Sequence, residues 1–328
     1  MQHKIGLALG GGGARGAIHI GILKTFLAHN IRFSAVSGTS AGSIVASCYS
    51  VGRLSALEDY MPSMDRKEIL RLMDPVFSKG LFRGAVVEEK IKELTLGKRI
   101  EDAEIPLCLI AVDIKSQKEA AFKKGPIATL SHASSAVPGI FAPVEYDSML
   151  LADGGILNNV PYDVLPGMGC DFTIAVDLNP NAANTAERKI GHSTVERKNT
   201  IESQISRLRE FQKEVEEKSL EAIRAEFCRI TKKCITNPEL KTFFAEKSNL
   251  SNSKAASSKS FRSILLKTAE SYYSSINLKP GQMPDLMLRP EREDLNSFNF
   301  LNAKKGIEYG EKYAERYIPL VDRMLENY

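Results

Sequence analysis

The stretch IGLALGGGGARG, residues 5–16, decides the fold, because it joins a short apolar run to four consecutive glycines. The apolar run 5–9 is typical of a buried strand. Apolar residues then recur at three- and four-residue spacing, which predicts a helix over 14–29. A strand, a glycine turn and a helix in this order indicate an α/β unit, whose helix N-terminus offers backbone N–H groups to an anion.

Further apolar runs extend this unit into a sheet. We predict strands at 33–37, 107–114, 149–153, 172–178 and 285–289, and helices at 41–52 and from about 302 to 327. Near-continuous apolar strands separated by helices favour a parallel or mixed sheet that is covered on both faces.

The composition excludes several classes of protein. The chain has 328 residues, 43% of them hydrophobic and 26% charged, which fits neither a disordered nor a fibrous protein. The net charge of +4 is too small to argue for a nucleic-acid partner. No secretory signal and no apolar run of transmembrane length is recognised, so we expect a cytoplasmic protein. Peripheral contact of this cytoplasmic protein with the inner membrane surface is a second possibility.

One segment, 181–260, differs in composition from the rest. It is poorer in apolar residues and carries more Lys and Arg than Asp and Glu. It ends in the polar stretch 247–260, whose composition is typical of a linker. Its apolar residues have mostly helical spacing. We therefore predict one domain over 1–328, with a core of 1–180 and 261–328 and a polar helical insertion over about 181–260.

The glycine loop does not fit the common nucleotide-binding motifs. Gly11, Gly13 and Gly16 satisfy GxGxxG, but a dinucleotide site needs an acidic residue about 20 positions later, and the first in the chain is Glu58. A nucleoside-triphosphate loop needs Gly-Lys-Ser/Thr, which is absent here. Two interpretations of the glycine loop remain. It forms an anion hole for another kind of substrate, or it is a turn whose glycines are needed only for tight packing.

A second motif, Gly38-Thr39-Ser40-Ala41-Gly42, matches GxSxG between a predicted strand and a predicted helix. In this context the serine protrudes from a sharp turn, and the flanking glycines remove the steric conflict. Ser40 is therefore the candidate nucleophile. A buried serine in an ordinary strand–helix turn is the alternative.

A nucleophilic serine needs a proton acceptor. Of the five histidines, only His132 is not dismissed by its position; the others are His3, His19, His29 and His192. Asp153 is better placed, because it follows a predicted strand and precedes Gly154 and Gly155 at the sheet edge where such active sites form. Turn formation by Asp-Gly is its alternative role. Asp113 and Asp177 also end predicted strands, but no glycine pair follows them.

Together, GGGARG, GTSAG and DGG resemble the patatin-like phospholipases, particularly their small bacterial members, over about 1–180 and again over about 261–328. The resemblance implies a three-layer α/β/α sandwich with a mostly parallel central sheet. It also implies a dyad without histidine, in which Ser40 is the nucleophile and Asp153 the base. The remaining motif residues have implied roles in the oxyanion hole (Gly11, Gly12, Gly13), as the motif's cation (Arg15) and as structural support (Gly16, Gly38, Gly42, Gly154, Gly155).

The implied activity is hydrolysis of acyl esters of phospholipids, lysophospholipids or neutral lipids, without a cofactor or an obligatory metal. The long segment 181–260 departs from the family pattern. Two other functions stay open: an acyltransferase that uses the same site, and a non-catalytic module that binds lipid or protein. The apolar residues within 73–82 form either a lipid-facing rim or ordinary core.

Overall fold

The structure is a computed structural model that describes residues 3–72, 82–138, 140–179, 283–291, 295 and 300–327. The predicted insertion at 181–260 and its linker lie outside the described residues, as does all of the segment 73–82 except Phe82. The domain boundaries given above therefore stay predictions.

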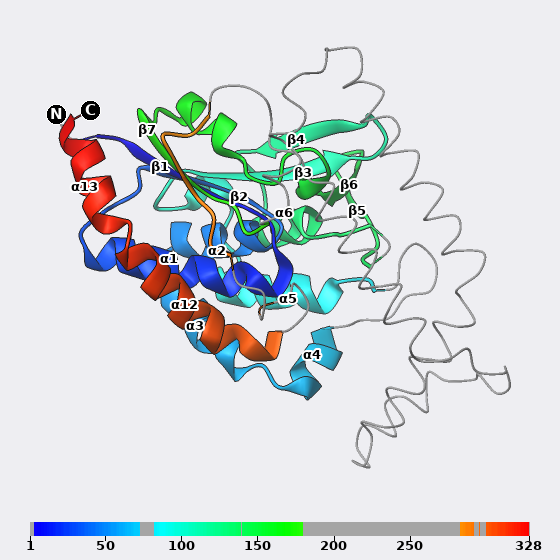
Figure 1. Ribbon diagram of the computed structural model, residues 1–328. Coiled ribbons are helices and arrows are strands. Elements are labelled where there is room, and N and C mark those ends of the chain that lie inside the picture. Colours follow the sequence, from blue (N-terminus) through cyan, green and yellow to red (C-terminus); the bar gives the residue numbers. More distant parts are fainter. Residues whose placement is uncertain are drawn as a thin grey trace, which may run out of the picture. The chain divides into compact units, whose positions relative to one another are not determined.

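The described strands form one sheet in the order β5-β6-β3-β2-β1-β7-β8, with β4 also paired to β3 (Figure 1). Neighbours from β3 to β8 in this order are parallel, whereas β4 and β6 run antiparallel to β3, and β5 antiparallel to β6. The α/β class and the mostly parallel sheet are thus confirmed. The strands are β1 (Ile5–Leu9), β2 (Ala35–Thr39), β3 (Leu107–Asp113), β4 (Lys118–Phe122), β5 (Val144–Tyr146), β6 (Met149–Asp153), β7 (Phe172–Val176) and β8 (Leu286–Leu288).

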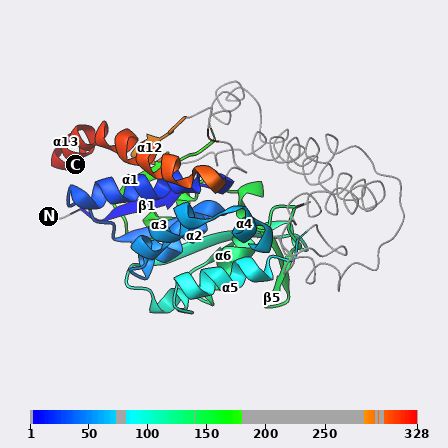
Figure 2. The ribbon, with the colours of Figure 1, turned by 90° about the horizontal axis from the view of Figure 1, so that it is seen from below.

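Helices cover one face of this sheet, and Figure 2 shows α1, α2, α3, α5 and α6 side by side there. The α-helices are α1 (Ala17–Ala28), α2 (Ala41–Ser50), α3 (Leu54–Ser63), α4 (Arg66–Leu72), α5 (Ala85–Leu94), α6 (Ile127–Ser134), α12 (Ala303–Glu315) and α13 (Ile318–Asn327). The 3-10 helices are η1 (Gly13–Gly16), η2 (Ile100–Asp102), η3 (Gly154–Ile156), η4 (Tyr162–Val164), η5 (Pro166–Met168) and η6 (Phe300–Asn302).

The two faces of the sheet are packed differently. Leu7 and Leu9 of β1 point into the large core under the helices, whereas Ala8 between them packs on the opposite face. There, Tyr162 and Leu165, from the segment that carries η4 and η5, cover the sheet. In the described part of the chain, this third layer is built from 3-10 turns rather than from α-helices. Small residues on this face let the segment approach the sheet closely.

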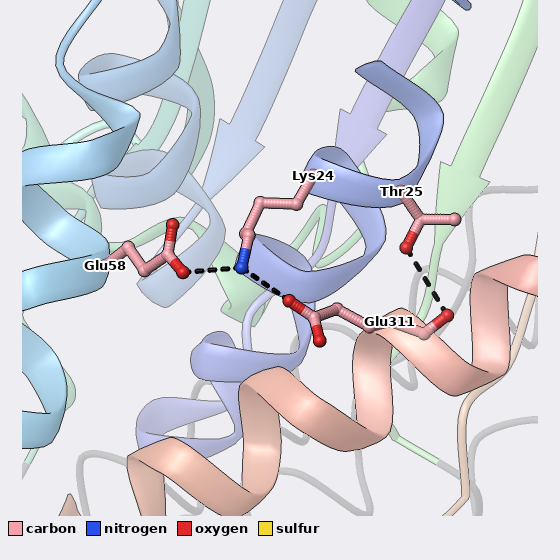
Figure 3. A network of polar contacts seen from close by, with 4 residues as sticks. All are labelled: Lys24, Thr25, Glu58 and Glu311. Carbon is pink, nitrogen blue, oxygen red and sulfur yellow. Dashed lines mark hydrogen bonds and ion pairs between the residues drawn. The ribbon is translucent and has the colours of Figure 1, made fainter. Parts of the chain in front are cut away.

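Helix α12 packs tightly against α1. A Cβ atom on Gly310 would lie 2.2 Å from the carbonyl oxygen of Ile18, so this crossing requires glycine. Lys24 of α1 pairs with Glu311 of α12 and with Glu58 of α3 (Figure 3). Residues far apart in the sequence are thereby joined on the helical face of the sheet.

Strand β2 begins two residues later than the predicted 33–37 and continues through Thr39. Gly38 and Thr39 stay extended because they pair with Leu109 and Ile110 of β3. This shift matters for function, since Ser40 now follows the last residue of the strand directly.

Candidate active site

Ser40 is the single residue between β2 and α2. Its backbone has φ 53° and ψ −125°, a conformation that costs a non-glycine residue about 1–3 kcal/mol. The turn fits only between glycines: a Cβ on Gly38 would lie 2.5 Å from the carbonyl oxygen of Gly42, and one on Gly42 would lie 2.0 Å from that of Leu9. This is the geometry expected of a GxSxG nucleophile turn.

Hydrogen bonds hold the strained turn on both sides. The N–H of Ser40 donates to Ser134 Oγ (2.9 Å), whose hydroxyl donates in turn to the carbonyl oxygen of Ile110 (2.5 Å). The hydroxyl of Ser43 donates to the carbonyl oxygen of Ser40 (2.6 Å). Ser134 is fully buried at the end of α6. The sequence gives no local signal for this role, because nothing distinguishes Ser134 from the serines around it.

Strand register places Asp153 at the same height in the sheet as Ser40. Thr39 is level with Ile110 of β3, and Asp153 of β6 is level with the next residue, Ala111. Ser40 and Asp153 therefore stand on the two sides of one strand, with backbones roughly 10 Å apart, twice the usual strand spacing. Alternation along β2 and β6 directs both side chains to the helix-covered face.

The Asp-Gly-Gly sequence has a clear local role. Asp153 is fully buried, and its Oδ1 accepts from the N–H of Gly155 (2.7 Å). A Cβ on Gly154 would lie 2.3 Å from the carbonyl oxygen of Ile110. The N–H of Asp153 donates to the carbonyl oxygen of Ala136 (3.0 Å). The end of α6 and the residues after it thus hold both Ser40, through Ser134, and Asp153, through Ala136.

The carbonyl groups of Gly11 and Gly12 accept hydrogen bonds from Asn179 and Arg15. Asn179 Nδ2 donates to the carbonyl oxygen of Gly11 (3.3 Å). The backbone N–H of Arg15 donates to the carbonyl oxygen of Gly12 (3.2 Å), and Nε of Arg15 lies 3.4 Å from the same oxygen. In a trans peptide the next N–H points away from the carbonyl. The amides of Gly12 and Gly13 therefore face the opposite side, and no group among the described residues accepts from either.

The Gly11 amide, which was also predicted as an oxyanion donor, differs from those of Gly12 and Gly13. It donates to the carbonyl oxygen of Asn159 (3.2 Å), so the protein itself uses this N–H. What Gly11 provides is space: a Cβ there would lie 2.6 Å from Asn159 Oδ1 and 3.0 Å from Ser40 Cβ.

Arg15 and Gly16 stabilise the position of the glycine loop. The guanidinium of Arg15 donates to Asn179 Oδ1 (2.7 Å), which links the loop to the end of β7. A Cβ on Gly16 would lie 2.9 Å from Ala41 Cβ, so glycine here lets the loop approach the first turn of α2. The loop and the serine turn are thereby packed against each other.

An apolar cavity of about 250 Å³ borders the serine. Ser40, Ala41, Gly13 and Gly16 line it together with mostly aliphatic and aromatic side chains from α2, α3, α4, α5 and 135–141. Phe82 also lines it and is 8% exposed. The glycine loop and the nucleophile thus meet at a pocket that suits an apolar group.

A family model for patatin-like phospholipases matches residues 7–166, the span that contains all three motifs. Residues 7–166 belong to the patatin-like phospholipase family. At the level of the family, this implies a lipid substrate and acyl hydrolysis.

Relatives agree with the assignment of this patatin-like domain. "Uncharacterized NTE family protein Rv1063c" of Mycobacterium tuberculosis is 36% identical over 184 residues, which are 56% of this chain and 51% of that protein. Human "Patatin-like phospholipase domain-containing protein 6" is 32% identical over 183 residues, which are 54% of this chain and 13% of that protein. The chain thus spans about half the length of its mycobacterial relatives.

A solved structure, VipD from Legionella pneumophila, aligns over 96% of this chain and 67% of that one, with 15% identity and a TM-score of 0.36. This score is too low to support an argument, so the fold rests on the strand topology and the family match. In the described residues, no helix is both long and apolar enough to cross a membrane. Nor does any group of three His, Cys, Asp or Glu side chains there have a metal-binding arrangement.

The histidines of the patatin-like domain have structural partners. His132 Nδ1 donates to Glu88 Oε2 (3.0 Å), and this hydrogen bond is the main cause that lowers the pKa of Glu88. Its ring packs edge-on against Phe141, and a Cβ on Gly84 would lie 2.1 Å from its Nε2. His132 is therefore directed toward α5 and its N-terminal end, not toward the serine turn.

The other strand-end carboxylates also have local roles. Asp113 accepts backbone N–H bonds from Lys115, Ser116 and Leu150, and hydrogen bonding by Ser116 is the main cause that lowers its pKa to about 2. Asp177 accepts from the N–H of Asn179 (2.9 Å), and burial raises its pKa. Both organise turns at the ends of their strands, whereas only Asp153 lies at the height of Ser40.

His19 supports the glycine loop from beneath. It is fully buried, and its Nε2–H donates to the carbonyl oxygen of Gly10 (2.7 Å). Burial lowers its pKa from 6.5 to about 4, so the ring is neutral near pH 7.

We expect this histidine to make stability depend on pH. Between pH 6.5 and pH 4 the unfolded chain binds a proton on residue 19 that the folded chain does not, so the stability present above pH 6.5 is lost as the pH falls toward 4. The loss is on the order of 3 kcal/mol. Urea unfolding of the wild type and of His19→Gln across this range measures it, and the difference in unfolding free energy between the two should narrow as the pH falls.

His29→Gln is the matched control, since His29 is exposed and pairs with Glu315 at the surface. It measures what the loss of a surface histidine does to the unfolding free energy under the same conditions. Parallel profiles for His19→Gln and the wild type would show that His19 does not titrate as expected.

Proposed function

We propose that the protein is a serine lipid acyl hydrolase of the phospholipase A or lysophospholipase type, acting through a Ser40–Asp153 dyad. One observation supports this most strongly. Ser40 occupies a strained turn at the wall of an apolar cavity, beside the amides of Gly12 and Gly13, from which no group in the described part of the chain accepts a hydrogen bond. Such a turn is retained where function requires it, because an ordinary turn would be more stable.

In the proposed first half-reaction, Asp153 takes the proton from the hydroxyl of Ser40, and the serine oxygen attacks the ester carbonyl. The amides of Gly12 and Gly13 donate to the developing oxyanion, an interaction often worth roughly 3–4 kcal/mol per donor. The intermediate then collapses: the ester bond breaks, the alcohol leaves with the proton from Asp153, and the acyl group stays on Ser40.

In the second half-reaction, water gives a proton to Asp153 and attacks the acyl-enzyme. The bond between the acyl carbon and Ser40 breaks, the serine regains its proton, and the fatty acid leaves. A dyad needs no histidine for either step, which fits the positions of His19 and His132 in the patatin-like domain.

The cavity is the proposed site of the acyl chain. Each methylene transferred from water into an apolar environment contributes about 0.8 kcal/mol. Esters of medium and long chains should therefore react with higher kcat/KM than acetate or butyrate esters. The substrate class that follows is a phospholipid or another acyl-ester lipid.

The test is fatty acid release by the purified full chain from p-nitrophenyl esters of increasing chain length and from dispersed phospholipid and lysophospholipid. We expect release that rises with chain length and that is absent in a matched preparation of Ser40→Ala. Equal release by the two preparations would refute the proposal. The same assay is repeated with glycerol or another alcohol present. If the acylated alcohol is then the main product, the proposed activity becomes acyl transfer at the same site.

A further inference from the structure

Two asparagines follow the Asp-Gly-Gly motif, and their side chains are bonded very differently. Asn158 Nδ2 donates to Asp163 Oδ1 (2.8 Å) and lies 3.4 Å from Glu119 Oε1. Asn159 is 1% exposed, and neither its Nδ2 nor its Oδ1 has a hydrogen-bond partner among the described residues. An unsatisfied buried polar group costs about 1–3 kcal/mol. Its retention therefore calls for a reason, such as an ordered water or a catalytic role.

The Asn159 carboxamide lies against the nucleophile. The position that a Cβ on Gly11 would take is 2.6 Å from Asn159 Oδ1 and 3.0 Å from Ser40 Cβ. Both groups therefore border the space that a side chain at position 11 would fill. A half-turn of the carboxamide exchanges its oxygen and nitrogen, so either atom can face Ser40.

The backbone keeps the carboxamide in this place. The carbonyl oxygen of Asn159 accepts from the N–H of Gly11 (3.2 Å), and that of Asn158 accepts from Thr39 Oγ1 (2.9 Å). Residues 158 and 159 are thus fastened both to the glycine loop and to the last residue of β2. Asn159 cannot withdraw from Ser40 without breaking these bonds.

A dyad makes a particular demand that an asparagine meets. A carboxylate is a weak base for a serine hydroxyl, so the negative charge that develops on the serine oxygen needs support. A hydrogen bond to an ionised acceptor is roughly twice as strong as one to a neutral acceptor. A carboxamide N–H therefore supports the alkoxide more than the hydroxyl, and it does not compete for the proton.

We propose that Asn159 is a further catalytic residue, whose carboxamide donates an N–H to Ser40 Oγ while that oxygen gives its proton to Asp153. No bond to Asn159 forms or breaks, and its own protons stay in place. This inference rests on the proposed dyad, and it adds a third polar side chain to it.

The test compares Asn159→Leu with Asn158→Leu, two adjacent and chemically identical replacements. Leucine at 159 removes from the interior two polar groups that have no partner among the residues the structure describes, so the melting temperature should stay the same or rise. In contrast, kcat should fall by at least about tenfold, with KM changed much less, because the lost interaction belongs to the transition state. Labelling by a fluorophosphonate probe should slow by a similar factor.

Asn158→Leu should show the opposite pattern. It loses the hydrogen bond to Asp163, so the melting temperature should fall, while kcat per folded molecule is retained. Asn159→Asp keeps the shape of the side chain and removes both N–H donors. It should lose activity as Asn159→Leu does. If the leucine variant does not fold, Asn159→Asp replaces it in the comparison.

Two results would overturn the inference while wild-type activity stands. One is a folded Asn159→Leu, or Asn159→Asp in its place, with kcat within about twofold of the wild type. The other is a parallel fall in melting temperature and kcat, which would assign Asn159 to a buried water that only supports the loop. A wild-type chain that neither releases fatty acid nor reacts with the probe would refute the proposed function itself, and this inference with it.

Discussion

Asp153→Asn should lower the turnover number by roughly 10²–10⁴-fold, the usual contribution of a general base. Asparagine has the same size as aspartate, and its carbonyl oxygen can still accept from the N–H of Gly155. The backbone bond to Ala136 is untouched. What the variant lacks is a group that takes a proton from Ser40, so the effect should fall on kcat far more than on folding.

The comparison that gives this result its meaning is His132→Ala. In a triad the histidine takes the proton and the aspartate only orients it, so both variants would lose activity. In the dyad, His132→Ala should lose activity only through its lost contacts with Glu88 of α5 and with Phe141, with a matching loss of stability. A folded His132→Ala variant that is as stable as the wild type and as inactive as Asp153→Asn would end the dyad account.

Ser40→Ala should remove hydrolysis of every ester that the wild type cleaves, while the thermal transition stays nearly unchanged. The hydrogen bonds that hold the turn use the backbone N–H and carbonyl of Ser40, and alanine keeps both. Alanine also carries the same backbone strain at φ 53°, so no gain in stability is expected.

Calorimetry of the two proteins, side by side with initial rates on one soluble ester, measures both parts of this prediction. The decisive comparison is with a preparation that contains no enzyme. Any rate of Ser40→Ala clearly above that blank means that another group performs the chemistry.

Several features of the site were predictable from the sequence, because local backbone rules determine them. A serine in GxSxG needs glycines where β2 turns into α2, and the Cβ clashes at Gly38 and Gly42 show why. The strands at 5–9 and 149–153 were placed correctly, since short apolar runs next to glycine leave few alternatives. The turn at Asp153 was recognisable for the same reason.

Other features depend on contacts between distant segments and have no local signature. Ser134 supports Ser40 across 94 positions, and Asn159 meets the glycine loop only after β1 and the loop behind β6 have come together. The use of the Gly11 amide by Asn159 could not be foreseen for the same reason. Strands β4 and β5 were missed because they are short and partly exposed, so they lack a clear apolar pattern.

The central claim is that Ser40 is the nucleophile, and mapping of a covalent adduct tests it most directly. The wild-type chain is treated with a fluorophosphonate, digested with trypsin and examined by mass spectrometry with fragmentation. We predict one adduct, in the peptide 33–53 and on Ser40 rather than on any other serine of that peptide. The adduct should be absent from Ser40→Ala and should form much more slowly in Asp153→Asn. An adduct on a different residue, or none while ester hydrolysis continues, would contradict the account.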